Sequence, residues 1–326
     1  MRLERRLPRV SVACLCVAAL TCLFVVSAAN GQQLTRSTSV TIDNDYFDFW
    51  LAPMKRPDND YSQGARVAWD MAAVPKPARR WLCTRRPACG STMEIGQEMY
   101  TPDVDAPTPV PGERPYAGWL YASATAVGAD RSSQRRIGLT LGVTGPPSLA
   151  AQAQEAFHHL VPGFRRPLGW DEQLPAELAF AARVGQSWYV LPVPSRQWLS
   201  LEPSMDALLG TLRTSARLGT RATLSLGPSH PWLNAPRQQA LGFTIFGGVY
   251  GEAVAHDLFL DGSTYQSSVR VTRTPFIGEW QAGSVLRLRR LAVEYRATTR
   301  SREYRTGPSN HAYGSITLRW ELKPVQ

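Results

Sequence analysis

After its first thirty residues, the sequence has no apolar run long enough to cross a membrane as a helix. It also has no Gly-x-Ser-x-Gly nucleophile elbow, no His-Glu-x-x-His zinc helix and no glycine-rich phosphate loop. No low-complexity or linker-like stretch divides the chain. These absences exclude a bundle of membrane helices and the common hydrolase and nucleotide-binding templates. They predict a single domain over residues 30–326.

Residues 1–29 have the composition of a secretory signal peptide. Four Arg residues within residues 1–9 precede the charge-free run Val10–Val26, and the small residues Ser27–Ala29 follow it. This order predicts export, with cleavage near Ala29. The alternative is a transmembrane anchor of about the minimum spanning length, which is disfavoured because small residues and Gly31 follow the run directly.

Cysteine is scarce in the predicted mature chain. Three of the five Cys residues fall in the signal segment, which leaves Cys83 and Cys89 in a polar, Arg-rich stretch. Two such residues in an oxidising compartment are expected to pair across a loop. No His stands near them at metal-ligand spacing, which argues against a zinc site. We therefore predict a disulfide that staples a loop.

Basic residues outnumber acidic ones. The signal segment carries four Arg and one Glu, so it takes three of the formal ten positive charges and leaves about seven. Guanidinium groups bind phosphate in bidentate fashion, so the excess of Arg suits phosphorylated lipid head groups. It would equally suit nucleic acid, but export argues against that partner.

Alternation of apolar and polar residues is the main pattern of the mature chain. In the clearest segment, Ser315–Leu322, four apolar side chains share one face and three polar ones share the other. A helix would scatter these residues around its circumference. The sequence predicts about twelve such strands, an even number as bacterial outer-membrane barrels require. The other eleven are Ser37–Asp45, Tyr61–Met71, Met93–Thr101, Trp119–Val127, Arg135–Val143, Leu178–Val190, Trp198–Leu209, Leu212–Leu224, Leu241–Gly251, Gln266–Thr274 and Val285–Tyr295.

Two features favour a membrane barrel over a soluble sandwich or barrel, whose strands would alternate in the same way. Arg287 and Arg289 alternate with leucines, which suits a polar lumen better than a dry core. Aromatic residues cluster at predicted strand ends, as interfacial girdles require; they are Trp119, Tyr121, Trp188, Tyr189, Trp198 and Trp320. The predicted fold class is all-β, a twelve-stranded antiparallel transmembrane β-barrel.

One stretch, Pro147–Val161, has apolar residues at helical spacing after a Gly-Pro-Pro turn. It predicts a short helix between the fifth and sixth strands. On this helix Gln154 and His158 stand four residues apart and share a face, which the neighbouring His159 does not.

Five polar residues are candidates for hydrolytic chemistry: Asn44 and Asp45 at the end of the first strand, Ser62 on the second, and Gln154 and His158 on the helix. An ester hydrolase needs a base to activate its nucleophile and a donor-rich site for the developing oxyanion. His158 is the natural base, although a single helical His more often has a structural role. A Ser-His-Asp arrangement of Ser62, His158 and Asp45 also stays open, because triads are recognised by geometry.

Several motifs, in one order along the mature chain, resemble the lipid A 3′-O-deacylase family of outer-membrane barrels. A series of long motifs in the same order is far more specific than any single one. The motifs are Asn44–Phe47, Tyr61–Gly64, Gly96–Asp103, Glu113–Tyr121, Gln154–His158, Gly169–Leu174 and Phe259–Gly262.

The resemblance implies an active site between lumen and lipid near the outer leaflet, and calcium-dependent hydrolysis of the 3′-linked acyloxyacyl group of lipid A. By position, it assigns the catalytic His to His158, the helix Gln to Gln154 and the strand hydroxyl to Ser62. It assigns the Asn-Asp pair to Asn44 and Asp45, whose hard oxygen atoms suit Ca²⁺. In the implied mechanism, His158 deprotonates a water that attacks the ester, while Ca²⁺ polarises the carbonyl oxygen.

This interpretation implies an outer-membrane protein whose partner is lipid A, or lipopolysaccharide, of the outer leaflet, and we expect a monomer. A Lys that contributes to the site in some family members has no counterpart in Thr101–Gly112, and Arg114 is the candidate to replace it. Two other functions stay open: an outer-membrane phospholipase acting on glycerophospholipid esters, and a porin or structural barrel. A porin would conduct ions and leave lipid A unchanged.

Overall fold

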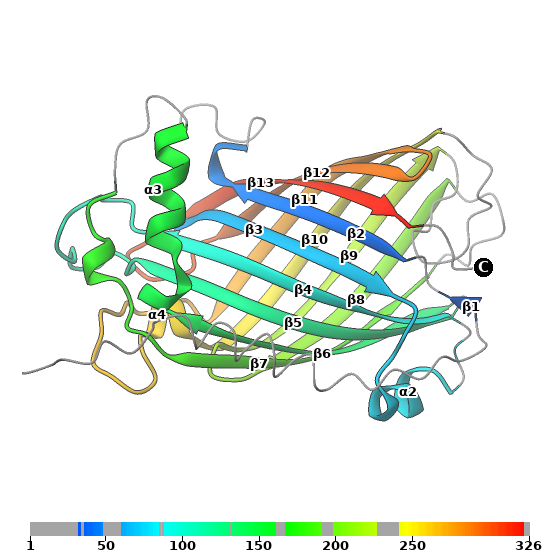
Figure 1. Ribbon diagram of the computed structural model, residues 1–326, viewed down its shortest axis with the longest axis horizontal. Helices are drawn as coiled ribbons and strands as arrows, with labels where there is room; N and C mark the ends of the chain where they lie inside the picture. The colour runs from blue at the N-terminus through cyan, green and yellow to red at the C-terminus, as the bar shows by residue number, and fades with distance from the viewer. Residues whose placement is uncertain are drawn as a thin grey trace, which may run out of the picture.

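Twelve long strands, β2 to β13, follow one another around a closed antiparallel barrel, which Figure 1 shows as a computed structural model. The structure describes residues 32–33, 36–47, 60–84, 86, 88–130, 132–160, 167–190, 198–226 and 241–322. The predicted signal peptide, residues 1–29, lies outside these ranges. The predicted fold class is confirmed.

The barrel strands are β2 (Ser37–Asn44), β3 (Asp60–Met71), β4 (Ala88–Thr101), β5 (Ala117–Ala129), β6 (Ser133–Thr144), β7 (Leu178–Trp188), β8 (Leu199–Leu209), β9 (Arg213–Leu226), β10 (Leu241–Asp257), β11 (Phe276–Leu288), β12 (Leu291–Ser301) and β13 (Asn310–Glu321). The short strand β1 (Gln32–Gln33) pairs in parallel with the start of β4. The helices and 3-10 turns are η1 (Asp45–Phe47), α2 (Lys76–Leu82), η2 (Pro146–Ser148), α3 (Ala150–Leu160), η3 (Trp170–Glu172) and α4 (Leu258–Asp261).

Each barrel strand pairs with its neighbours in the sequence, and the ring closes where β13 pairs with β2. The helix predicted between the fifth and sixth barrel strands is present as α3, between β6 and β7. Helix α2, between β3 and β4, was not predicted. Among the described residues, no helix is both long and apolar enough to cross a bilayer.

The period-two pattern separates a polar inner face from an apolar outer face. On β2, Ser39, Thr41 and Asp43 are buried inside the barrel, while Val40 and Ile42 are 44% and 45% exposed on its outer surface. Exposed apolar side chains around a closed sheet are typical of strands that face lipid.

Ion pairs fill much of the lumen. Arg66 contacts Asp43 at 2.6 Å, and Arg213 contacts Glu252 at 3.1 Å. Arg300 contacts the other carboxylate oxygen of Glu252 at 3.2 Å. Charges in a dry core would be costly without such partners. The prediction of a polar lumen is therefore confirmed.

The predicted strand Gln266–Thr274 is wrong. These residues belong to the connection between α4 and β11, where only an isolated bridge joins Arg273 to Tyr304. The alternation there is short and belongs to a loop. Pairing with neighbours on both sides, which defines a barrel strand, cannot be deduced from alternation alone.

The predicted strand Val285–Tyr295 is also wrong, because it runs through a tight turn between β11 and β12. Arg289 lies in this turn with a φ of 55°, exposed, and does not face the lumen as predicted. Arg287, on β11, does face inward, where it pairs with Glu321. An Arg-Arg turn contains none of the residues that usually mark a hairpin.

The predicted aromatic girdle is half right. The residues exposed on the outer surface are Trp188, Trp198 and Trp320. The residues buried inside are Trp119, Tyr121 and Tyr189. On β5, Trp119 and Tyr121 fall on the inward face and pack with Leu174, Leu258 and Phe259. Strand parity, and not position near a strand end, decides which aromatic side chains face lipid.

The two ends of the barrel have different connections. At one end lie the turn at residues 289–290 and the connection that carries α2; at the other lie the turn at residues 210–212 and the longer connections 102–116, 145–177 and 258–275. Outer-membrane barrels have short periplasmic turns and longer extracellular loops. By this rule the end that carries α3 and α4 in Figure 1 is extracellular, and the end that carries α2 is periplasmic.

Candidate active site

Three residues near the extracellular end of β4 face outward from the barrel. Glu98 and Tyr100 face the lumen, because their side chains bond each other and Tyr100 stacks on Phe259. The alternate residues Gln97, Met99 and Thr101 must therefore face the opposite way. Met99 and Thr101 are nevertheless 2% exposed, so another part of the chain covers them.

Helix α3 covers this part of the outer wall. Gln97 Nε2 donates to the carbonyl oxygen of Ser148, just before the helix, at 2.6 Å. Met99 packs with Ala150, the first helical residue. A Cβ added to Gly118, on the outer face of β5, would lie 2.4 Å from the Ala150 Cβ. The helix thus sits directly on the strands, and not inside the barrel.

Gln154 lies on the buried side of this helix, with 1% of its surface exposed. Its Oε1 accepts a hydrogen bond of 2.7 Å from Trp170 Nε1, and Trp170 in turn packs against Tyr116. The connection after the helix therefore folds back and fixes the orientation of the Gln154 amide.

His158 follows one turn later on the same face and is half-buried, with its Nε2 shielded from solvent. Its ring lies 6.2 Å, centroid to centroid, from the ring of Phe157. The side chain of His159 lies outside the part of the chain that the structure describes. The contrast between the two histidines therefore stays a prediction.

Ser62 occupies a β-bulge in β3. Tyr61 pairs with Tyr100 and Gln63 pairs with Met99, so Ser62 is the extra residue between them. Its side chain is fully buried, and its Oγ forms a short hydrogen bond with the Oγ1 of the outward-facing Thr101. Bulges are common next to active sites, where they redirect a side chain.

Asn44 and Asp45 lie where β2 passes into η1. Asp43 faces the lumen and bonds Arg66, so Asn44 falls on the outward side, where it is buried. Asn44 Oδ1 accepts a hydrogen bond of 2.8 Å from the Tyr46 amide, which fixes the turn. Asp45 is half-buried, and its Oδ1 is shielded from solvent.

The candidate residues thus gather on the outer side of one sector of the wall, at its extracellular end. Asn44 pairs with Gln63, the residue after Ser62. The side chains of Asn44 and Ser62 therefore lie on adjacent strands. Gln154 and His158 lie on the helix that packs against β4 and β5. In Figure 1, α3 stands across the ends of these strands and rises toward the level of η1.

One sequence-based hypothesis does not fit the geometry, and another stays a hypothesis. Ser62 Oγ shares a hydrogen bond with Thr101 Oγ1 in which either atom can be the donor, so this contact does not test a Ser-His-Asp arrangement of Ser62, His158 and Asp45. Arg114 does not replace the missing Lys, because its guanidinium lies over the lumen-facing ring of Tyr100, 4.7 Å from the centroid.

Arg114 belongs instead to a buried ion cluster at the barrel mouth, with Asp60 at 3.3 Å and Glu303 at 3.6 Å. Burial alone would lower the pKa of Arg114, but these two carboxylates outweigh it and raise the pKa. Burial alone would raise the pKa of Glu303, but Arg300, His311 and Arg114 hold it at about 2.

Sequence reasoning missed Thr101 and the bulge at Ser62. The motif Gly96–Asp103 includes Thr101. The contact of Thr101 with Ser62 depends on a β-bulge, however, and no residue in β3 indicates that bulge in the sequence. It also missed Trp170, which lies in the motif Gly169–Leu174 and fixes the amide of Gln154.

The donor set at the end of β2 fits a calcium ion in kind. Asn44 and Asp45 offer amide and carboxylate oxygens, and Ca²⁺ takes six to eight such ligands, including backbone carbonyls and water. No group of three or more His, Cys, Asp or Glu residues with metal-site geometry occurs within the described ranges. These two side chains could therefore form only part of a coordination shell.

Two comparisons with known proteins found matches, one to a protein family and one to solved structures. Residues 13–322 match the family described as outer membrane protein LpxR. LpxR from Salmonella typhimurium has a similar structure, with a TM-score of 0.72 at 19% sequence identity, over 88% of this chain and 100% of that chain. The translocator domain of the autotransporter NalP from Neisseria meningitidis aligns over 94% of each chain, with 12% identity and a TM-score of 0.42. No curated protein matches this chain.

Proposed function

Because this chain belongs to the LpxR family of outer membrane proteins, we propose that it removes the 3′-linked acyloxyacyl group of lipid A, with His158 as the base. Family membership and the barrel fold make it a protein of the bacterial outer membrane. Family membership also supports the broader assignment of a lipid A deacylase. The position of the cleaved ester and the roles below are our proposal.

The position of α3 on the outer wall is the observation that supports this function best. Lipid A in the outer leaflet reaches a barrel from the side, where its acyl chains contact the lipid-facing strands. A base on α3, above the outward faces of β4 and β5, is accessible to such a substrate without its entry into the lumen. A base inside the barrel would not be accessible to a substrate that approaches from the membrane.

In the proposed reaction, His158 takes a proton from a water whose oxygen bonds to the ester carbonyl carbon. The carbon–oxygen bond to the sugar then breaks, and the imidazolium of His158 returns the proton to the departing sugar oxygen. Gln154 Oε1 is held by Trp170, so its NH₂ group is oriented to donate to the developing oxyanion. Ser62, fixed by Thr101, orients the ester beside it.

Asn44 and Asp45 would hold the calcium ion that the family resemblance implies, next to Ser62 on the neighbouring strand. When bound, the ion would supply a positive charge that stabilises negative charge on the carbonyl oxygen. We also propose that residues 1–29 are removed on export, which N-terminal sequencing of the protein from outer membranes would test.

A porin is disfavoured by the side chains that cross the lumen. Trp119, Tyr121, Leu174, Leu258 and Phe259 form one buried cluster near the extracellular end. A channel needs a continuous aqueous path, which such a cluster interrupts. A phospholipase remains chemically close, because the same base and amide would serve a glycerophospholipid ester.

Purified enzyme incubated separately with lipid A and with phosphatidylethanolamine tests the proposal. Mass spectrometry should show loss of one acyloxyacyl group from lipid A, and intact phospholipid. His158→Ala should abolish the loss, while His256→Ala, a matched change at the His whose Nε2 contacts the Thr211 carbonyl, should retain it. Release of fatty acid from phospholipid alone would contradict the assignment.

A further inference from the structure

Helix α2 lies against the outer wall of the barrel at its periplasmic end. Its residues Ala78 and Leu82 pack with Val74 onto Ala126, which faces outward because Trp119 and Tyr121 on the same strand face inward. A Cβ on Gly128 would lie 2.3 Å from the carbonyl oxygen of Leu82. The helix backbone therefore touches the lipid-facing side of β5.

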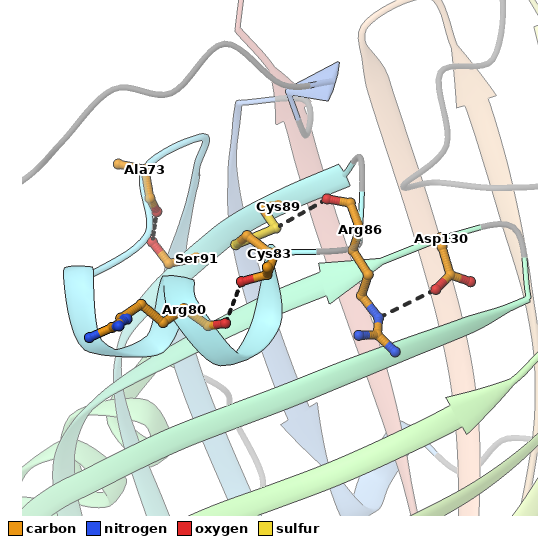
Figure 2. Close-up of a disulfide and its surroundings, with 8 residues drawn as sticks. Ala73, Arg80, Cys83, Arg86, Cys89, Ser91 and Asp130 are labelled. Carbon is orange, nitrogen blue, oxygen red and sulfur yellow. Dashed lines mark hydrogen bonds and ion pairs between the residues drawn. A yellow bond between two sulfur atoms is a disulfide. The ribbon is translucent and has the colours of Figure 1, made fainter.

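A disulfide holds the end of this helix. Figure 2 shows that Cys83, the C-cap residue of α2, is bonded to Cys89 on β4. Their Cα atoms lie 5.9 Å apart. The predicted disulfide is thus confirmed. A helix of seven residues is not stable alone in water. Packing on the barrel and the disulfide therefore fix the position of α2 beside the membrane.

The face of α2 that points away from the barrel is basic. Lys76, Arg79 and Arg80 stand at positions i, i+3 and i+4, and the first turn contains no acidic residue. Within the described residues, none of the three forms an ion pair with a carboxylate. Like charges at this spacing destabilise a helix unless an anion lies near them. Figure 2 shows the Arg80 side chain extending away from the Arg86–Asp130 ion pair.

The carboxylate of Asp130, which is drawn near the disulfide in Figure 2, is already paired. Asp130, in the turn between β5 and β6, contacts Arg86 at 3.5 Å and accepts hydrogen bonds from the Ser132 and Ser133 amides. The positive charge of α2 is therefore not neutralised by this carboxylate.

Trp81, on the same helix, is 47% exposed, and the guanidinium of Arg135 lies 5.5 Å from the centre of its ring. Trp side chains favour the boundary between hydrocarbon and head groups. Arg135 also donates to Gln186 at 3.0 Å, which keeps it on the outer surface beside Trp81. An exposed Trp with basic neighbours is the arrangement expected at a lipid interface.

We propose that the exposed surface of α2, with Lys76, Arg79 and Arg80 on its basic face and Trp81 at its flank, binds the phosphate groups of anionic phospholipids in the periplasmic leaflet. Basic side chains next to a membrane attract anionic lipids, and each contributes about fivefold to binding. The indole anchors the helix at head-group depth, while the basic side chains contact the phosphates. This lipid site lies at the opposite end of the barrel from the candidate active site and does not depend on deacylase activity.

Native mass spectrometry of the mature protein, released from detergent with equimolar phosphatidylglycerol and phosphatidylcholine of the same acyl chains, tests the proposal. Wild type should retain phosphatidylglycerol in preference. In the triple variant Lys76→Gln, Arg79→Gln, Arg80→Gln, the preference for phosphatidylglycerol should be at least about tenfold smaller. The matched control Arg270→Gln, Arg302→Gln, Arg305→Gln removes the same charge from exposed extracellular loops. This control should retain the wild-type preference for phosphatidylglycerol.

A faster gel mobility of unheated samples would show that both variants are folded barrels. Wild-type preference in the α2 variant, or an equal loss in the extracellular control, would overturn the proposal. Displacement of phosphatidylglycerol by inorganic phosphate at the same concentration would also overturn it, because the site would then recognise a free phosphate and not a lipid head group.

Discussion

A substitution at Gly118 tests whether the packing of α3 against the barrel wall determines the geometry of the active site. A Cβ at this position would lie 2.1 Å from Ser148 Oγ and 2.4 Å from Ala150 Cβ. The Ser148 hydroxyl can rotate away, but the Ala150 Cβ moves only with the helix. Ordinary contact begins at 3.4 Å, so the Gly118→Ala variant must displace the start of α3 by about 1 Å.

A displacement of about 1 Å at a catalytic group can lower turnover about 100-fold. The strand itself should hold, because β5 is paired along its length with both β4 and β6. We therefore expect Gly118→Ala to form a barrel with roughly a hundredth of the wild-type rate of acyloxyacyl release from purified lipid A. Mass spectrometry measures the rate, and the mobility shift of unheated protein reports folding.

Gly251→Ala is the matched control, since a Cβ at this outward-facing position of β10 would meet nothing within 4 Å. It should retain the wild-type rate. If Gly118→Ala turned over lipid A at the wild-type rate, the contact between α3 and the wall would not control the site. An equal loss in both variants would assign the effect to the strand and not to the helix.

Three further predictions concern the site and the disulfide. His158→Ala should lower turnover by about 100-fold or more while the barrel folds, since a positioned base contributes about 10²–10⁴-fold, and His159→Ala should have a much smaller effect in the same assay. Asp45→Ala should be inactive with or without added Ca²⁺, because an anionic ligand is missing. Wild-type enzyme inactivated by a chelator should recover its activity when Ca²⁺ is restored. If the wild-type enzyme were active in excess chelator, the mechanism would not require the metal. Reduction of Cys83–Cys89 should leave mobility and turnover almost unchanged, because the pair closes a small loop, and unfolding in reductant would show a larger role.

Much of the barrel could be predicted because one physical constraint repeats along it. Every strand has one polar and one apolar face, so alternation locates most strands and their number. The pattern fails where a turn lacks a sequence marker, as at Arg289, or where a loop alternates by chance, as at residues 266–274. Strand pairing, which the sequence does not contain, decides both cases.

The site residues could be proposed only because their motifs resemble a known family. A lone His158 on a helix, or Asn44 before Asp45, is compatible with purely structural roles. Position on the outer wall depends on the parity of β4 and on the bulge at Ser62, and neither can be counted from the sequence. The roles of Thr101 and Trp170 could not be predicted, because these roles consist of contacts with the side chains of Ser62 and Gln154.

The most direct test of the central claim is mass spectrometry of lipid A from cells that produce wild type, the His158→Ala variant or no protein. The proposed function predicts that only wild-type cells contain lipid A that is lighter by one 3′-linked acyloxyacyl group. The same lipid A in all three cell types, with wild type folded in the outer membrane, would contradict it.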